Sequence, residues 1–273
     1  RRQRQMCIRD RFNYKSYIMF KKHPKGLIAA ALANMGERFG FYIMMAILTL
    51  FISAKFGLSE TTTGYIYSAF YASIYILALA GGLIADKTKN FKGTILAGLV
   101  LMAVGYLIIA IPTPTPVPSM ALYLTLTCFG LLVIAFGNGL FKGNLQALVG
   151  QMYDNPVYSN LRDAGFQIFY MFINIGGFFA PFIAIGVRNW WLKVNNFDYD
   201  ATLPELCHQY INHIDSGAEM PAQAMENLTT LSNSVILDGQ AVTDLHAFAN
   251  SYLDVFNRGF QYAFMAATVS YTH

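Results

Sequence analysis

Charged residues are scarce in this chain. Only 12% of its 273 residues are Asp, Glu, Lys or Arg, whereas a typical soluble domain carries roughly 25%. Hydrophobic residues make up 55% of the chain and gather in long blocks rather than being scattered. A soluble core of this size does not need so few charges, so the composition indicates a membrane protein.

Cysteine is also scarce, and sequence patterns of catalytic or metal sites are missing. The three cysteines, at positions 7, 128 and 207, form no CxxC pair and have no metal-ligand spacing. We find no phosphate-binding loop and no Ser/His/Asp arrangement. We therefore expect no cofactor, no bound metal and no enzymatic activity.

The formal net charge of +4 comes from one end of the chain. Residues 1–11, RRQRQMCIRDR, hold five Arg and one Asp, and the remaining residues sum to zero. The run resembles translated sequencing-adapter read-through, as does VSYTH at 269–273. We expect both ends to be non-native and the chain to be cut from a longer one. The basic end therefore does not indicate a nucleic-acid partner.

Five hydrophobic segments are long enough to cross a bilayer as helices. They span residues 26–53, 64–85, 93–111, 120–141 (continuing to about 150) and 165–187, and a sixth begins at 260–269. The predicted organisation is a cytoplasmic N-terminus at 1–24, helices one to five at 25–188, a loop at 189–256 and the start of helix six at 257–273.

Lys and Arg in the short loops place the N-terminus in the cytoplasm and the loop after the fifth segment outside. That loop, residues 190–257, contains nine Asp or Glu and no Lys or Arg between Lys193 and Arg258. We predict a small acidic cap with short amphipathic helices at 221–231 and 242–252. His208 and His213 are predicted to be solvated within it.

Two adjacent charges, Glu37 and Arg38, lie inside the first predicted span, where each costs about 2.5–3.5 kcal/mol at the centre of a bilayer. Adjacent helix residues point about 100° apart, so we expect the two not to share one partner well. Arg38 shares a face with Phe41 and Tyr42, and a guanidinium beside aromatic rings suits a carboxylate ligand. The alternative is a structural ion pair that locks helices together.

The fourth span presents a row of polar residues at Asn138, Lys142 and Gln146, spaced four apart on one helix face. Glu37 is the predicted partner of Lys142 across the helices; the alternative is a lysine that reaches the membrane surface. Similar rows occur in two other spans. They are Ser68, Tyr71 and Tyr75 in the second, and Gln167, Tyr170 and Asn174 in the fifth. Four helices with polar rows predict a water-filled cavity.

Four motifs resemble those of the proton-dependent oligopeptide transporters, a branch of the major facilitator superfamily. NMGERFGFY at 34–42 is similar to the first-helix signature ExxERFxYY, and GGLIADKTKNFK at 81–92 to the motif after the second helix. GNGLFKGN at 137–144 resembles the fourth-helix motif GxGLFKPN, and RDAGFQIFYMFINIGGFFAP at 162–181 resembles the fifth-helix signature.

The resemblance implies an all-α, polytopic membrane bundle: the N-terminal six-helix half of a major facilitator fold, with an acidic extracytoplasmic loop. It implies peptide contacts at Arg38, Tyr42, Tyr75, Lys142 and Asn174, with Phe41 also walling the site. It also implies that Glu37 and Lys142 form the charge pair that responds to protonation. Asn34 replaces the first Glu of the signature and cannot take a proton, and Phe41 replaces its first Tyr.

We expect an importer of di- and tripeptides coupled to protons, in the bacterial cytoplasmic membrane. The expected partners are short peptides, protons, the lipid bilayer and a missing C-terminal six-helix bundle. One alternative is another facilitator-type carrier, for drugs or anions. Two others are a membrane-embedded enzyme, for which we find no nucleophile or metal ligands, and a non-transporting sensor whose cap binds the ligand.

Overall fold

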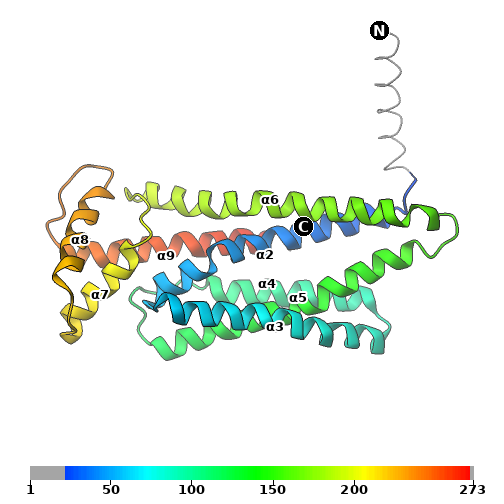
Figure 1. Ribbon diagram of the computed structural model, residues 1–273, viewed down its shortest axis with the longest axis horizontal. Coiled ribbons are helices and arrows are strands. Elements are labelled where there is room, and N and C mark those ends of the chain that lie inside the picture. The colour runs from blue at the N-terminus through cyan, green and yellow to red at the C-terminus, as the bar shows by residue number, and fades with distance from the viewer. Residues whose placement is uncertain (1–21, 271–273) are drawn as a thin grey trace, which may run out of the picture.

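The computed structural model describes residues 22–270, and every regular element in that range is a helix (Figure 1). The expectations for residues 1–21 and 271–273 lie outside the described residues. The helices are α2 Gly26–Phe56, α3 Glu60–Thr88, α4 Phe91–Ala110, α5 Met120–Met152, η1 Ser159–Leu161, α6 Arg162–Val194, α7 Leu203–Ser216, α8 Ala222–Ser234 and α9 Leu245–Val269.

Five of the described segments are long and apolar enough to cross a membrane, and each covers one of the five predicted spans to within one residue. They are Gly26–Phe56, Glu60–Thr88, Phe91–Ala110, Met120–Met152 and Ser159–Val194. The helices extend beyond the hydrophobic runs because local caps, not hydropathy, set their ends. Ser59 accepts a hydrogen bond from the amide of Thr62 at the start of α3, and Asn90 does the same for Gly93 in α4.

The five candidate spans and α9 form two groups that lie side by side. In one group α5 packs along both α3 and α4; in the other, α2, α6 and α9 pack together (Figure 1). Glycines allow the closest approaches within the first group: a Cβ built on Gly81 of α3 would lie 2.2 Å from the carbonyl oxygen of Gly139 in α5. The second group instead closes around buried aromatic rings, such as Phe51 of α2 against Phe264 of α9, 4.9 Å between centroids.

Residues 195–244, with α7 and α8, form a cap over one end of the bundle, where α2, α4 and α6 end and α9 begins (Figure 1). The predicted helix at 221–231 corresponds to α8. The predicted separation between a short helix at 242–252 and a sixth span from 260 is wrong, because α9 runs unbroken from Leu245. Asp244 caps its first turn, and no residue interrupts it afterwards.

Helix α7 was not predicted. One of its two histidines, His208, is buried rather than solvated. His208 is 9% exposed, and its Nε2 lies 2.7 Å from the carbonyl oxygen of Ala54 at the end of α2. Burial lowers the pKa of His208 and raises that of its neighbour Cys207 to about 12. The cap is therefore docked on the bundle through α7. His213, in contrast, is only partly buried.

Candidate functional site

The polar row of α5 connects three other helices. Asn138 donates to Glu37 of α2, with 2.7 Å between Nδ2 and Oε1. One turn later, Nζ of Lys142 lies 5.5 Å from the ring centroid of Tyr75 in α3. Another turn on, Nε2 of Gln146 lies 3.5 Å from the hydroxyl of Tyr170 in α6. The polar row of α5 therefore contacts α2, α3 and α6 in turn, one helix at each of its three residues.

Glu37 and Arg38 are both buried, at 1% and 6% exposure, and they pair with each other. The guanidinium donates twice to the carboxylate, through Nε and, at 2.6 Å, through Nη2. Helix geometry suggested only that the two residues would not share one partner well, and it did not predict that they pair with each other. Arg38 bends its long side chain back along the helix, which an argument from Cβ directions alone does not consider.

Arg38 also borders a cavity of about 280 Å³ between α2, α3 and α5, which we call the inner cavity. Its guanidinium carbon lies 4.7 Å from the ring centroid of Phe41. The walls combine two cationic side chains with aromatic and aliphatic ones. They are Arg38, Phe41, Tyr42, Met45, Tyr67, Tyr71, Ile74, Tyr75 and Lys142. The structure thus brings five of the six predicted substrate-binding residues together.

Tyr67 is a lining residue that the sequence analysis missed. It precedes Tyr71 and Tyr75 at the same four-residue spacing, which was the available signal. The rings of Tyr67 and Tyr71 stack with centroids 6.2 Å apart, and the hydroxyls of Tyr71 and Tyr75 lie 3.1 Å apart. The tyrosine row of α3 forms an aromatic wall with hydroxyl groups pointing into a polar space.

Asn174, the sixth predicted residue, does not border the inner cavity. It is exposed on α6 and lines a separate, open hollow of about 540 Å³ together with Gln167, Tyr170 and Phe178. Helix α6 nevertheless lies close to α2, because a Cβ on Gly176 would be only 2.6 Å from the carbonyl oxygen of Met35. The polar face of α6 therefore flanks the inner cavity without closing it.

The arrangement suits an anionic group on a ligand of modest size. Two cationic side chains border a space lined by aromatic rings, so a carboxylate there could interact with Lys142 and could compete with Glu37 for the guanidinium of Arg38. Within residues 22–270, no three His, Cys, Asp or Glu side chains gather as ligands for a metal ion. The lining of the inner cavity is chemically compatible with an organic anion or zwitterion.

Comparison with known proteins agrees with this geometry. The sequence profile of the POT family matches residues 92–200, from α4 through α6. Residues 92–200 are thus similar to the POT family. Five helices that can span a membrane, together with this match, make the chain a multi-pass membrane protein.

Two curated relatives carry names that describe peptide transport. Dipeptide and tripeptide permease A of Cronobacter turicensis is 34% identical over 161 residues, covering 58% of this chain and 30% of the permease. The peptide transporter YePEPT of Yersinia enterocolitica is 35% identical over 185 residues, 66% of this chain and 34% of that protein. The chain thus spans about a third of the length of these relatives.

Solved structures share the fold. A crystal structure of a mutant of the peptide transporter POT with sulfate superposes with a TM-score of 0.53 at 34% identity, covering 62% of this chain and 33% of that one. A crystal structure of tetrameric PepTSo2 gives a TM-score of 0.56 at 23% identity, and the match covers 90% of this chain and 38% of that one. The second likeness extends the shared fold over most of the chain, including the region beyond α6.

Proposed function

We propose that this chain is the N-terminal, six-helix part of an importer of di- and tripeptides driven by a proton gradient. The observation that carries the proposal is the inner cavity, where Arg38 and Lys142 face tyrosine side chains at the meeting of α2, α3 and α5. The matched relatives are peptide permeases and transporters by name. The family profile itself covers α4 to α6 and leaves α2 and α3 outside.

A short peptide is a zwitterion, and the inner cavity suits its carboxylate end. Arg38 and Lys142 hold the carboxylate, while Phe41, Tyr42 and Tyr75 wall the space for side chains. Asn174 contacts the peptide backbone from the exposed face of α6. A second six-helix bundle, packed against these open faces, completes the site and provides the alternating access that such carriers need.

Proton coupling rests on Glu37, with Lys142 as the second charge of the switch. Because Glu37 accepts two hydrogen bonds from Arg38, the guanidinium is held by that carboxylate when no peptide is bound. Protonating Glu37 weakens this pair and releases Arg38 for the peptide carboxylate, while Lys142 supplies the additional positive charge. Asn34 offers no second carboxyl group, so the pH dependence depends on Glu37.

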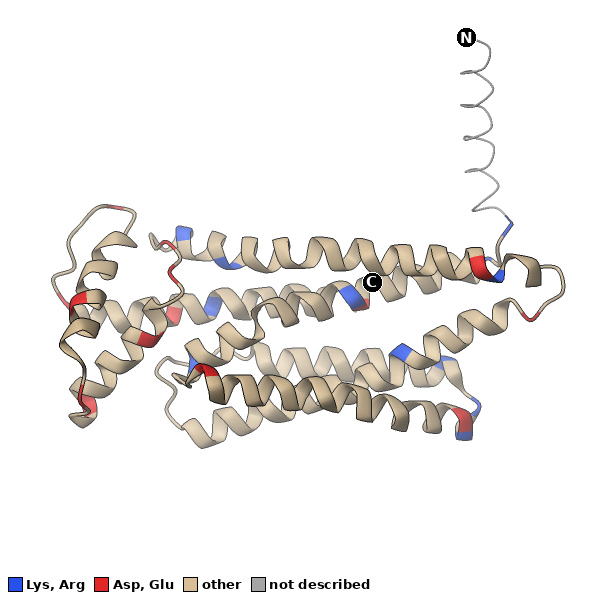
Figure 2. Ribbon diagram, viewed as in Figure 1, with Lys and Arg blue, Asp and Glu red and all other residues tan. Residues whose placement is uncertain are grey.

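The proposed location is the bacterial cytoplasmic membrane, with the N-terminus inside. Lys87, Lys89 and Lys92 lie around the connection between α3 and α4, at the end of the bundle where α2 begins. Acidic segments gather at the other end, in and around the cap (Figure 2). This separation of charge follows the preference of cytoplasmic loops for Lys and Arg.

The test is uptake of a labelled dipeptide by proteoliposomes that contain the full-length protein. Glu37→Gln should retain exchange of peptide across the membrane but lose accumulation driven by an imposed pH gradient. Glu226→Gln, which alters an exposed carboxylate of α8, is the matched control and should accumulate peptide normally. Undiminished accumulation by Glu37→Gln would place the coupling group elsewhere. Competition by anions or drugs but not by dipeptides would indicate a different carrier.

A further inference from the structure

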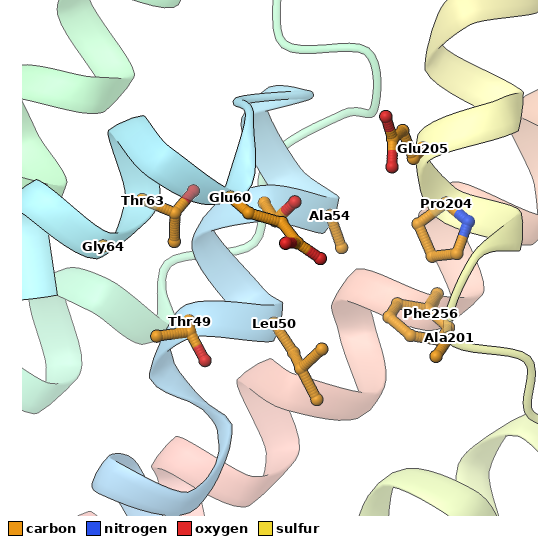
Figure 3. A pocket seen from close by; sticks show the side chains of 11 residues that line it. Thr49, Leu50, Ala54, Glu60, Thr63, Gly64, Ala201, Pro204, Glu205 and Phe256 are labelled. Carbon is orange, nitrogen blue, oxygen red and sulfur yellow. The ribbon is translucent and has the colours of Figure 1, made fainter.

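A second pocket lies where the cap meets the ends of α2 and α3, which we call the outer pocket. Its volume is about 260 Å³, and its walls come from α2, α3, the loop before α7 and the helices α7 and α9 (Figure 3). Glu60 of α3 and Glu205 of α7 provide its charged groups, and Thr49 and Ser53 of α2 provide hydroxyls. No Lys or Arg belongs to the described lining.

The nearest lysine in the sequence is turned away from this pocket. Lys55 is 3% exposed, and its Nζ lies 5.2 Å and 5.5 Å from the ring centroids of Phe51 and Phe56. One oxygen of Glu205 accepts a bond from Gln209 at 3.2 Å, which leaves its other lone pairs available. The outer pocket is therefore an acidic site without a cation of its own among its walls.

The wall also contains a buried polar group that has no partner. The side chain of Thr63 lines the outer pocket, the residue is 2% exposed, and its hydroxyl makes no hydrogen bond in the described part of the chain. Figure 3 shows Thr63 on the same wall as Glu60, one helical turn further along α3. Buried hydroxyls are normally paired, so this oxygen is available to accept an N–H bond from a ligand, or to donate to one.

The outer pocket leads toward the inner cavity along one pair of helix faces. On α3, Thr63 is followed at four-residue intervals by Tyr67 and Tyr71, which line the inner cavity. On α2, Thr49 shares a face with Met45, which also lines the inner cavity. Since four residues of helix rise about 6 Å, the two spaces lie one after the other along these helices. Their charges are opposite: acidic outside and basic inside.

We propose that the outer pocket is a docking site for a primary ammonium group, and that it captures the amino end of a peptide before the carboxylate reaches Arg38 and Lys142. Glu60 and Glu205 attract the cation, and the hydroxyl of Thr63 accepts one of its N–H bonds. The docking role rests on the proposed peptide-transport function, whereas the binding of an ammonium group does not.

The first measurement is binding, which is independent of transport. The probe is alaninamide, which has an ammonium group but no carboxylate for the inner cavity, titrated into the full-length protein in lipid nanodiscs. Binding should weaken about tenfold in the Glu60→Gln, Glu205→Gln double variant and severalfold in Thr63→Val, which replaces the hydroxyl by a methyl of similar size. Glu226→Gln should leave it unchanged.

Equal alaninamide affinity in the parent and in both sets of variants would overturn the proposal. So would binding of Ca²⁺ in place of alaninamide, because that would make the pocket a metal site. If the double variant does not fold, Thr63→Val decides by itself, since removing an unpaired buried hydroxyl should stabilise the protein while weakening the binding of the amine.

The second measurement is the initial rate of dipeptide uptake at low substrate concentration. In the double variant, kcat/KM should fall about tenfold at low ionic strength, with kcat unchanged, and the difference should shrink in high salt. Loss of alaninamide binding with unaltered kcat/KM would refute the docking role. If the protein transports no peptide but binds alaninamide through Thr63, the proposed transport function fails while the ammonium site stands.

Discussion

The faces of helix α5 differ in how they meet their neighbours. On two different sides, Gly137 lies against the backbone of α4 and Gly139 against that of α3: a Cβ would approach a carbonyl oxygen to 2.7 Å and 2.5 Å, respectively. We call each of these sides a glycine face. On a third side, the polar face, Asn138, Lys142 and Gln146 reach α2, α3 and α6 through their side chains. The glycine faces are closed by backbone contact, whereas the polar face borders the inner cavity.

This difference shows how one helix can both hold a helical bundle together and contribute side chains to a binding site. In a membrane, helices gain little from hydrophobic burial against one another, so close packing through small residues provides much of their association. Polar residues in the same helix are then available for binding, because the fold does not depend on sealing them. Changes to a glycine face should therefore affect folding, and changes to the polar face should mainly affect the site.

The largest expected effect is on a glycine face. Gly139→Val should destabilise the bundle by about 3 kcal/mol or more, because its Cβ would overlap the carbonyl group of Leu77 in α3 and force the helices apart. Gly143→Val is the matched control, since nothing lies within 4 Å of a Cβ at that position. Thermal unfolding in detergent measures both. Equal melting temperatures would show that the close approach of α3 and α5 is not needed.

A smaller effect is expected at the start of the polar row. Asn138→Leu removes a donor to the buried carboxylate of Glu37 and should cost about 1–3 kcal/mol of stability. Gln146→Leu, on the same face, should cost less than about 1 kcal/mol, because its contact with Tyr170 is long at 3.5 Å and exposed to solvent. If Gln146→Leu proves the more damaging change in thermal unfolding, the two ends of the row have been ranked wrongly.

Sequence patterns predicted the spans and most of the inner cavity because both depend on regular helices. Hydropathy located five segments, and the four-residue spacing placed Lys142 and Tyr75 on faces that meet. The pairing of Arg38 with Glu37 was not predicted, because it depends on how a flexible side chain folds back along its own helix. Asn174 lines a separate hollow for a related reason: residues on one face of α6 need not face the same space as those of α2.

The cap was harder to predict than the spans. Its sequence is polar, so the burial of α7 depends on a few contacts made far along the chain, such as His208 with Ala54. Periodic patterns in a sequence do not predict a contact between residues that are 154 positions apart. For the same reason the outer pocket is invisible in the sequence: Thr63 and Glu205 come from segments that only the fold brings together.

The smallest expected effect concerns ligand affinity rather than stability. In the full-length protein, Arg38→Lys should weaken dipeptide binding about tenfold, which corresponds to ~1.4 kcal/mol. Lysine keeps the positive charge but loses the planar pair of donors that a carboxylate accepts. Phe41→Tyr is the matched change on the same helix face, since it keeps the ring that lies beside Arg38 and adds one hydroxyl. We expect it to leave affinity unchanged or slightly improved, by less than about threefold.

Equilibrium binding of a labelled dipeptide to the two variants distinguishes a binding role for Arg38 from a purely structural one. If Arg38 serves only to neutralise Glu37, then Lys should replace it with little change in affinity, while thermal stability falls because two hydrogen bonds to a buried carboxylate are lost. If Arg38 binds the peptide, affinity falls more than stability does. Equal affinities for Arg38→Lys and Phe41→Tyr would assign the carboxylate to Lys142 alone, and the polar face of α5 would then supply the whole anion site.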